Sequence, residues 1–306
     1  MSSSRRNFLK QGTMAVAGAA LLSDKLFAAP KDTTILGVQL YSVRDDMEKD
    51  PAGTLKLVAG AGYKYVEHAG YGNRKFYGQY SAADFKKLLD DLGLQMKSGH
   101  TYMGREHWDE SKNDFTDKWK QTVEDAAIVG QAYVISPGLD ESYRKNMDGL
   151  KRYMGVFNKS GELCKKSGMK FGYHNHDFEF SQKIDGQKVF DIILQNTDPS
   201  LVAQQLDIGN MYSAGGIALD VLKQYPNRFE LMHVKDEIKT TGKGELGGGY
   251  ESCVLGKGII PVKEVVDFGK KSGGTIHFII EQESYQGMAP IDSIKQDYDI
   301  MKKWGY

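Results

Sequence analysis

Side chains that bind metals or transfer protons recur in short segments along this 306-residue chain. Each segment directly follows a short apolar, β-prone run, and five of the seven histidines lie in such segments. Four equivalent positions on successive runs are held by His174, Asp207, His233 and Glu281. Buried carboxylates and imidazoles packed together repel or need neutralising, and a divalent cation satisfies both. The pattern therefore predicts one divalent metal ion (Mn, Co, Mg or Zn, which the residues do not distinguish), with positions left open for substrate oxygens.

Further polar residues in the same segments could take part in catalysis. His176 follows His174 by two residues, so both imidazoles point to one face of an extended strand, and either could be the first ligand. The predicted acid–base groups are Glu281, His176, Lys235 and His100. The predicted substrate contacts are Glu67, His68, Tyr41, Asn210, Asp236 and Glu283. Several of these residues could instead have a structural role. His100 could be a hydrogen-bonded core residue, and Lys235 could form an ion pair.

The runs that must position these residues alternate with amphipathic helical patterns. Eight strands are predicted at 35–42, 63–68, 95–100, 133–137, 170–176, 202–207, 231–235 and 276–281. Helices are predicted at 83–92, 115–129, 147–166, 189–195, 218–224, 262–271 and 291–303. Eight βα units predict an α/β fold, a (β/α)8 TIM barrel formed as a single domain by residues 30–306. An open, doubly wound sheet is the alternative, but no glycine-rich phosphate loop follows the first strand.

The barrel explains why the polar residues come where strands end, because active sites of such barrels lie at the carboxyl ends of the strands. A glycine-rich stretch at 240–259 follows the seventh strand and so borders this face, either as a mobile lid or as a plain insertion. Aromatic residues that could stack on a ring-shaped ligand also occur near the strand ends. They are Tyr41, Tyr71, Tyr102, Trp108, Phe178 and Tyr212.

The first 29 residues resemble a targeting segment. Residues 4–10 read Ser-Arg-Arg-Asn-Phe-Leu-Lys, which resembles the twin-arginine export signal, and a weakly apolar stretch at 12–22 follows. The sequence thus predicts export to the periplasm, with an unclear cleavage site. Beyond this segment, no run is long and apolar enough for a stable membrane span.

Charge and cysteine content exclude several other classes. The 40 basic and 40 acidic residues balance, but without residues 1–29 there remain 36 basic and 39 acidic ones, a net charge of about −3. A slightly acidic protein argues against a nucleic-acid partner, since phosphate-backbone binding needs a surplus of Lys and Arg. Two cysteines exclude a disulfide scaffold, and their spacing does not favour a pair. No pattern predicts an oligomeric state.

Three motifs resemble the xylose isomerase-like TIM-barrel superfamily, the sugar phosphate isomerase/epimerase group. They are residues 172–180 (Gly-Tyr-His-Asn-His-Asp-Phe-Glu-Phe), 206–210 (Leu-Asp-Ile-Gly-Asn) and 233–236 (His-Val-Lys-Asp). The resemblance covers about residues 33–306 and implies one divalent ion held by Glu, Asp, His and Glu from strands five to eight. Here Asp207, His233 and Glu281 match the last three, whereas His174 stands where the family has Glu. That departure weakens the case for two-base epimerisation.

Several reactions share the first step that such a site implies, removal of a proton next to a sugar ketone to give an enediolate. A small carbohydrate, a keto-sugar or keto-glycoside, is the expected substrate. Export favours free sugars or glycosides over sugar phosphates, and hence a lyase that eliminates the aglycone from 3-keto-glycosides. A sugar isomerase or epimerase is the alternative. Two further alternatives are a non-catalytic sugar-binding barrel and a DNA-repair enzyme like endonuclease IV. The slightly acidic net charge argues against the DNA-repair enzyme.

Overall fold

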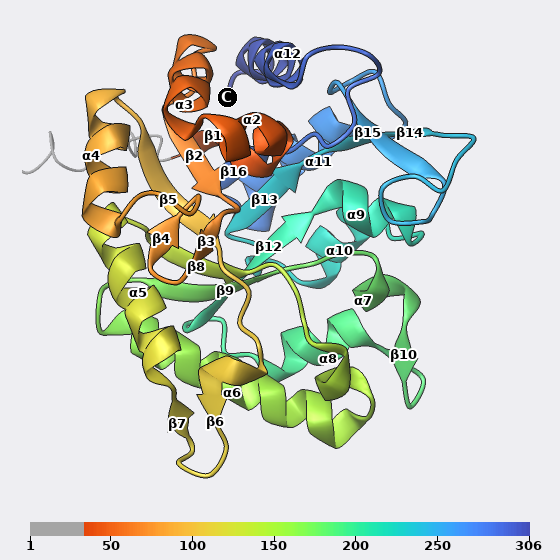
Figure 1. Cartoon of the computed structure of the whole chain (residues 1–306). Helices are drawn as coiled ribbons and strands as arrows, with labels where there is room; N and C mark the ends of the chain where they lie inside the picture. Colours follow the sequence, from red (N-terminus) through yellow and green to blue (C-terminus); the bar gives the residue numbers. More distant parts are fainter. Residues whose placement is uncertain (1–33) are drawn as a thin grey trace, which may run out of the picture. The chain divides into compact units, whose positions relative to one another are not determined.

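The protein, seen in a computed structural model that describes residues 34–306, is built on a closed barrel of eight parallel strands. The predicted export segment lies outside the described residues. Strand β16 pairs with both β13 and β1, which closes the sheet, and helices surround the strands (Figure 1). The predicted (β/α)8 barrel is therefore confirmed, and the open doubly wound sheet is excluded.

Each predicted strand contains one barrel strand. They are β1 (Ile35–Gln39), β2 (Tyr65–His68), β5 (Gln95–His100), β8 (Tyr133–Ser136), β9 (Lys170–His174), β12 (Val202–Asp207), β13 (Leu231–Val234) and β16 (His277–Ile280). Several end earlier than predicted, because the chain leaves the sheet as soon as the polar segment begins. His176 accordingly lies just beyond β9, and Glu281 just beyond β16.

Seven helices match the predicted patterns closely. They are α4 (Ala82–Asp91), α5 (Asp117–Val129), α6 (Met147–Lys165), α8 (Val189–Asn196), α10 (Ala218–Gln224), α11 (Val262–Phe268) and α12 (Pro290–Lys303). A π-helical turn at Gly269–Gly273 completes the predicted length of α11. Helices α2 (Arg44–Lys49), α3 (Pro51–Gly60), α7 (Phe178–Ser181) and α9 (Ile208–Ser213) were not predicted. Three of these four have six residues or fewer, which is too short to show a helical period.

The barrel interior is layered, with apolar side chains beneath polar ones. Ile135, Ala203 and Leu231 form a small buried cluster that is separate from the two larger cores. Since side chains alternate along a strand, Gln205 and His233 share the inward face of Ala203 and Leu231. The interior therefore changes from apolar to polar toward the carboxyl ends of the strands.

Antiparallel hairpins are added to this face of the barrel. The pairs are β3 (Tyr71–Gly72) with β4 (Lys75–Phe76), β6 (Trp108–Asp109) with β7 (Asp114–Phe115), β10 (Lys183–Ile184) with β11 (Gln187–Lys188), and β14 (Asp236–Lys239) with β15 (Tyr250–Cys253). Cys164 and Cys253 are buried and free. No helix among residues 34–306 has the length and apolar character needed to cross a membrane.

Candidate metal centre and active-site cavity

Four predicted metal ligands converge at the carboxyl ends of four neighbouring strands. One ligand atom from each of His174, Asp207, His233 and Glu281 lies within 4.8 Å of the others, and all four residues are buried. His233 Nδ1 is 3.2 Å from Glu281 Oε2 and 3.7 Å from Asp207 Oδ2. His174 Nε2 is 3.9 Å from Asp207 Oδ2. Adjacent parallel strands thus bring together residues that are up to 107 positions apart in the sequence.

The donor atoms in this cluster suit a divalent cation. Asp207 caps helix α9, because its Oδ1 accepts the backbone N–H of Asn210 at 2.7 Å. Its second oxygen, Oδ2, is buried and has no hydrogen-bond partner, which is a costly state for a carboxylate. Burial raises the pKa of Glu281, but His233 and Lys235 outweigh it and hold that pKa well below its usual value. Two carboxylates beside two imidazoles, with one carboxylate oxygen left without a partner, therefore fit the expected metal.

Gln205, which was not among the predicted site residues, orients two of the histidines. Its Nε2 donates to Glu67 Oε2 at 2.8 Å, which fixes the amide with Oε1 toward the histidines. Because Oε1 only accepts, His174 Nδ1 at 3.0 Å must carry a proton, which leaves His174 Nε2 as a free lone pair. His100 Nε2 lies 2.7 Å from the same oxygen. The alternation of β12 could have revealed Gln205, two residues before Asp207.

Glu67 supports the metal cluster from below instead of contacting substrate. It is fully buried, and its Oε1 lies 2.6 Å from His233 Nε2 and 2.8 Å from Gln39 Nε2. Burial raises the pKa of Glu67, but His100 and His233 bring it well below its usual value. A carboxylate behind a ligating histidine fixes the tautomer and orientation of the ring. The predicted substrate contact of Glu67 is thus replaced by a positioning role.

Lys235 lies in a cage of carboxylates and does not border the cavity. Its Nζ donates to Glu283, and it lies 3.3 Å from Glu245 Oε2 and 3.8 Å from Glu281 Oε2. Burial lowers the pKa of Lys235, but these acidic neighbours outweigh it and hold the pKa well above its usual value. The observed contacts give Lys235 a role in positioning the acidic residues around it. Its predicted catalytic role stays a prediction.

Two further predicted substrate contacts point away from the site. His68 follows the inward-facing Glu67, so it faces the helices, where its ring packs edge-on against Phe76 at 5.0 Å between centroids. Burial lowers the pKa of His68 to about 3, which keeps the ring neutral. Asp236 accepts backbone N–H groups of Gly256, Gly258 and Ile260 and so shapes the loop before α11. Neither side chain lies on the wall of the cavity beside the metal cluster, because both alternate out of the barrel.

The remaining predicted residues line one cavity of about 360 Å³ beside the metal cluster. Predicted residues on its wall are Tyr41, His100, His174, His176, Asn210, Glu281 and Glu283. His174 and His176 thus share one pocket, although only His174 belongs to the metal cluster. The His176 ring makes no hydrogen bond to any other residue within 34–306. It is therefore the cavity histidine that is free to exchange a proton.

The glycine-rich stretch contributes to the same cavity. Glu245 and Leu246, from the connection between β14 and β15, lie on the cavity wall. Glu245 Oε1 accepts both the backbone N–H and the hydroxyl of Ser252, at 2.8 and 2.6 Å. The first part of the stretch is therefore the tip of the β14–β15 hairpin, and this tip forms part of the cavity wall. Whether it moves as a lid stays a prediction.

Comparisons with known proteins agree with this geometry. Residues 55–304 match the family model of the xylose isomerase-like TIM barrel. Inosose dehydratase of Clostridium perfringens is 34% identical over 171 residues, which cover 52% of this chain and 56% of that protein. The match thus spans little more than half the length of this relative.

Two solved structures share the fold. A sugar phosphate isomerase/epimerase from Parabacteroides distasonis superposes with a TM-score of 0.75 at 23% identity, over 90% of this chain and 96% of that one. A structure of the IolI protein with a bound zinc atom has a TM-score of 0.65 at 14% identity, over 88% and 97% of the two chains. The match to the family model covers most of the sequence, and the closed barrel agrees with it. The chain therefore belongs to the xylose isomerase-like TIM barrel family.

Proposed function

We propose that this protein is a divalent-metal-dependent carbohydrate lyase that eliminates the aglycone from 3-keto-glycosides. The observation that carries the proposal is the cluster of His174, Asp207, His233 and Glu281, of which His174 and Glu281 line a cavity that also contains the His176 imidazole. The similarity to an inosose dehydratase supports a lyase, because a dehydratase also breaks a carbon–oxygen bond. The zinc atom in the IolI structure supports a metal in this fold.

The four clustered residues would hold the ion, and Gln205 and Glu67 would orient its histidine ligands. When bound, a divalent ion supplies a Lewis acid that polarises the sugar ketone and stabilises negative charge on its oxygen. Every other requirement of the reaction falls to the side chains around the cavity.

Proton transfer is assigned to the two histidines that line the cavity. His176, whose ring has no hydrogen bond to another described residue, takes the proton from C2. The electrons of the C2–H bond move into an enolate with the C3 carbonyl. As the enolate collapses, a C1–C2 double bond forms and the C1–oxygen bond breaks, with its electron pair leaving on the aglycone oxygen. His100 donates from Nε2 to Gln205, so Nδ1 can deliver a proton to that oxygen only when the ring carries a proton on both nitrogens.

A sugar isomerase or epimerase is the second candidate, because both reactions begin with the same proton transfer. The similarity of the barrel to that of a sugar phosphate isomerase/epimerase favours it. The replacement of the family's first glutamate by His174 favours the lyase, since two carboxylate bases are then not available on opposite faces of the sugar. Reprotonation of the enolate, in place of loss of the aglycone, would distinguish the second candidate.

A chromogenic 3-keto-β-glucoside tests the proposal, with the protein loaded in turn with Mn, Co, Mg and Zn. We expect release of the chromophore together with exchange of the C2 proton in deuterated water, both lost in His233→Ala and both strongly reduced in His176→Gln. Exchange without release would indicate the isomerase or epimerase. Neither release nor exchange with any metal would overturn the proposal.

We also propose that residues 1–29 direct export through the twin-arginine route, which supports the choice of glycosides over sugar phosphates. The motif at residues 4–10 and the apolar stretch after it are the support. Fusion of residues 1–35 to a reporter tests the idea. We expect reporter activity in the periplasm, and we expect it to disappear when Arg5 and Arg6 are both changed to Lys. Periplasmic activity that the double change does not affect would contradict export by this route.

A further inference from the structure

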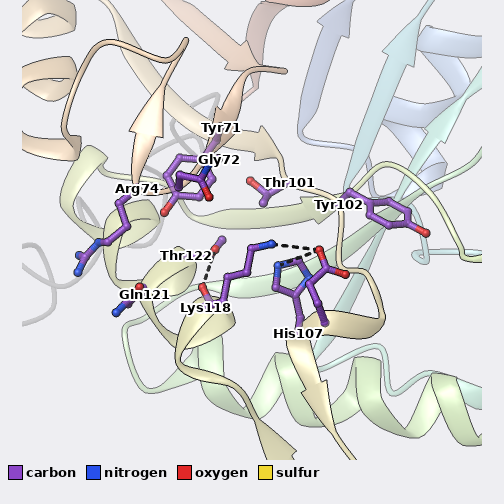
Figure 2. Close-up of a pocket in the computed structure, with 11 residues that line it drawn as sticks. Tyr71, Gly72, Arg74, Thr101, Tyr102, His107, Lys118, Gln121 and Thr122 are labelled. Carbon is purple, nitrogen blue, oxygen red and sulfur yellow. Dashed lines mark hydrogen bonds and ion pairs between the residues drawn. The ribbon is translucent and has the colours of Figure 1, made fainter.

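A second cavity of about 400 Å³ lies at the carboxyl ends of β2 and β5, on the same face of the barrel as the metal cluster. The β3–β4 hairpin forms one side with Tyr71 and Gly72, and helix α5 and its approach form the other with Lys118 and His107 (Figure 2). Its volume is within the range of about 300–1,000 Å³ that is usual for small-molecule sites. Neither the metal cluster nor the proposed proton transfers use it.

The two cavities adjoin, because two chain segments pass directly from one to the other. His100 lines the metal cavity, and the next residue, Thr101, lines the second. Ala69 lines the first, and Tyr71 the second. Successive Cα atoms are about 3.8 Å apart, so the step between the cavities is no longer than one or two residues. A ligand of two linked rings could therefore occupy both.

Tyr102 marks the border between the two cavities. It lines the second cavity, and it extends away from Lys118 and His107 (Figure 2). Its ring edge lies beside Gly138, which follows the Pro137 of the metal cavity. The side chain is 43% exposed, so part of this aromatic residue is accessible to a ligand.

The hairpin wall is held rigidly at a conformational cost. Asn73 and Arg74 both have positive φ angles, 50° and 60°, which match a type I′ turn, and such a turn normally has glycine at its second central position. Arg74 is held there by a two-pronged contact with the buried Asp125, at 3.1 and 2.7 Å. Tyr71 donates its hydroxyl to the same carboxylate at 2.7 Å. A strained, clamped hairpin that forms a cavity wall is typical of a preformed binding site.

The charged side chains that line the second cavity are already paired with other residues, and this indicates which chemical class of ligand the cavity could bind. Arg74 is committed to Asp125, and Lys118 Nζ lies 3.2 Å from Glu106 Oε1. No cation of the wall is left for a phosphate or carboxylate group. What remains is neutral hydrogen-bonding capacity, from Thr101 and Gln121 among others, beside two tyrosine rings. Such a lining suits a neutral ring that carries many hydroxyl groups.

We propose that this second cavity is a subsite for a neutral, hydroxyl-rich ring on the leaving-group side of the substrate, so that the preferred aglycone is itself a sugar or a similar polyol. The subsite rests on the proposed function for its place in the reaction. Its ability to bind a sugar ring is independent of that reaction.

Gly72 offers a direct way to fill the subsite. A Cβ added at Gly72 meets no atom within 4 Å, so Gly72→Phe should place a ring in the cavity without disturbing the backbone. Gly60 is equally open but lies at the end of α3 that leads to the amino end of β2, so Gly60→Phe is the matched control. Gln121→Ala is a milder second variant that only removes an amide from the wall.

Two measurements test the subsite separately from the function. With keto-substrates, we expect Gly72→Phe to lower kcat/KM about tenfold or more for a 3-keto-disaccharide, but less than twofold for a methyl 3-keto-glucoside. Gln121→Ala should show a smaller loss with the same selectivity. Gly60→Phe should leave kcat/KM unchanged for both substrates. For binding alone, titration calorimetry with an unoxidised disaccharide and with methyl glucoside should show tighter binding of the disaccharide, an advantage lost in Gly72→Phe.

The outcomes separate the two proposals. Equal effects of Gly72→Phe on both keto-substrates, or no effect on either, would overturn the subsite while the lyase stands. If no keto-glycoside reacts but the disaccharide advantage is present and disappears in Gly72→Phe, the lyase fails and the subsite stands. If the wild-type protein binds the disaccharide no better than methyl glucoside, the subsite is overturned.

Discussion

At the scale of single residues, the inward-facing polar side chains divide into those that touch the cavity and those that hold them. His174, His176 and Glu281 border the cavity, whereas Glu67 and Gln205 are buried beneath it. The second group is as important as the first for a metal site, because outer hydrogen bonds set the tautomer and basicity of the ligands.

The exchange Glu67→Gln tests this division. The amide keeps the size of the side chain but cannot act as a charged acceptor for His233 Nε2, so we expect metal affinity to fall about 10–100-fold. At saturating metal, KM should stay within twofold. Competitive metal titration measures the effect, with His68→Gln as the control. Unchanged metal affinity with a raised KM would restore Glu67 to the substrate contacts.

Asp297 in helix α12, which is not part of the metal cluster, provides a pH-dependent test. Its Oδ1 accepts the backbone N–H of Leu255 at 2.8 Å, but Oδ2 is buried without a partner, and burial raises its pKa to about 7. The folded protein therefore binds a proton that the unfolded chain loses near pH 4, so this group makes the folded state less stable as pH rises from about 4 to 7.

The variant Asp297→Asn removes this titration. Its stability relative to the wild type should rise by on the order of 2–4 kcal/mol between pH 4 and 7 and stay level above pH 7. Urea unfolding at a series of pH values measures the difference. A difference that does not change with pH would show that Asp297 is not protonated in the folded state.

At the scale of elements, the β14–β15 hairpin is the part of the active-site face that the simple barrel pattern does not include. Ser252 in β15 joins the hairpin to the end of β16, because its hydroxyl donates to Glu245 and accepts the N–H groups of Glu283 and Ser284. One hydroxyl thus connects the closing tip to the segment that carries Glu281 and Glu283.

Removal of the Ser252 hydroxyl should weaken the attachment of the hairpin tip to the segment after β16 without changing metal affinity. For Ser252→Ala we expect a several-fold rise in KM and unchanged metal affinity, since the hydrogen bonds of Ser252 go to Glu245, Glu283, Ser284 and Gln286 and not to the four clustered residues. Steady-state kinetics with a keto-glycoside and a metal titration check the two parts. The exposed Ser111, changed to Ala, serves as the control. Weaker metal binding in Ser252→Ala would show that the hairpin shapes the metal cluster itself.

At the scale of the whole molecule, four separate strands contribute ligands, so metal binding and folding of the barrel are linked. A ligand that binds only the folded state stabilises it by about 2.7 kcal/mol at a hundredfold excess over Kd. We therefore expect the suited divalent ion to raise the Tm of the chelator-treated protein by several degrees, measured by calorimetry. His233→Ala should show no such rise. A Tm that no ion of the panel changes would contradict a metal site in the cluster.

The sequence by itself determined the barrel and the approximate place of the site. Alternating strand and helix patterns recur eight times, and the parallel topology then puts every strand end on one face, so His174, Asp207, His233 and Glu281 were predictable as neighbours. Residue types could not show which way a side chain points where a strand ends. Tertiary structure alone placed His68 and Asp236 outside, Glu67 and Lys235 beneath the cavity, and Gln205 between the histidines. The second cavity likewise depends on a hairpin and a helix that meet only in the folded protein, because contacts between distant segments leave no period in the sequence.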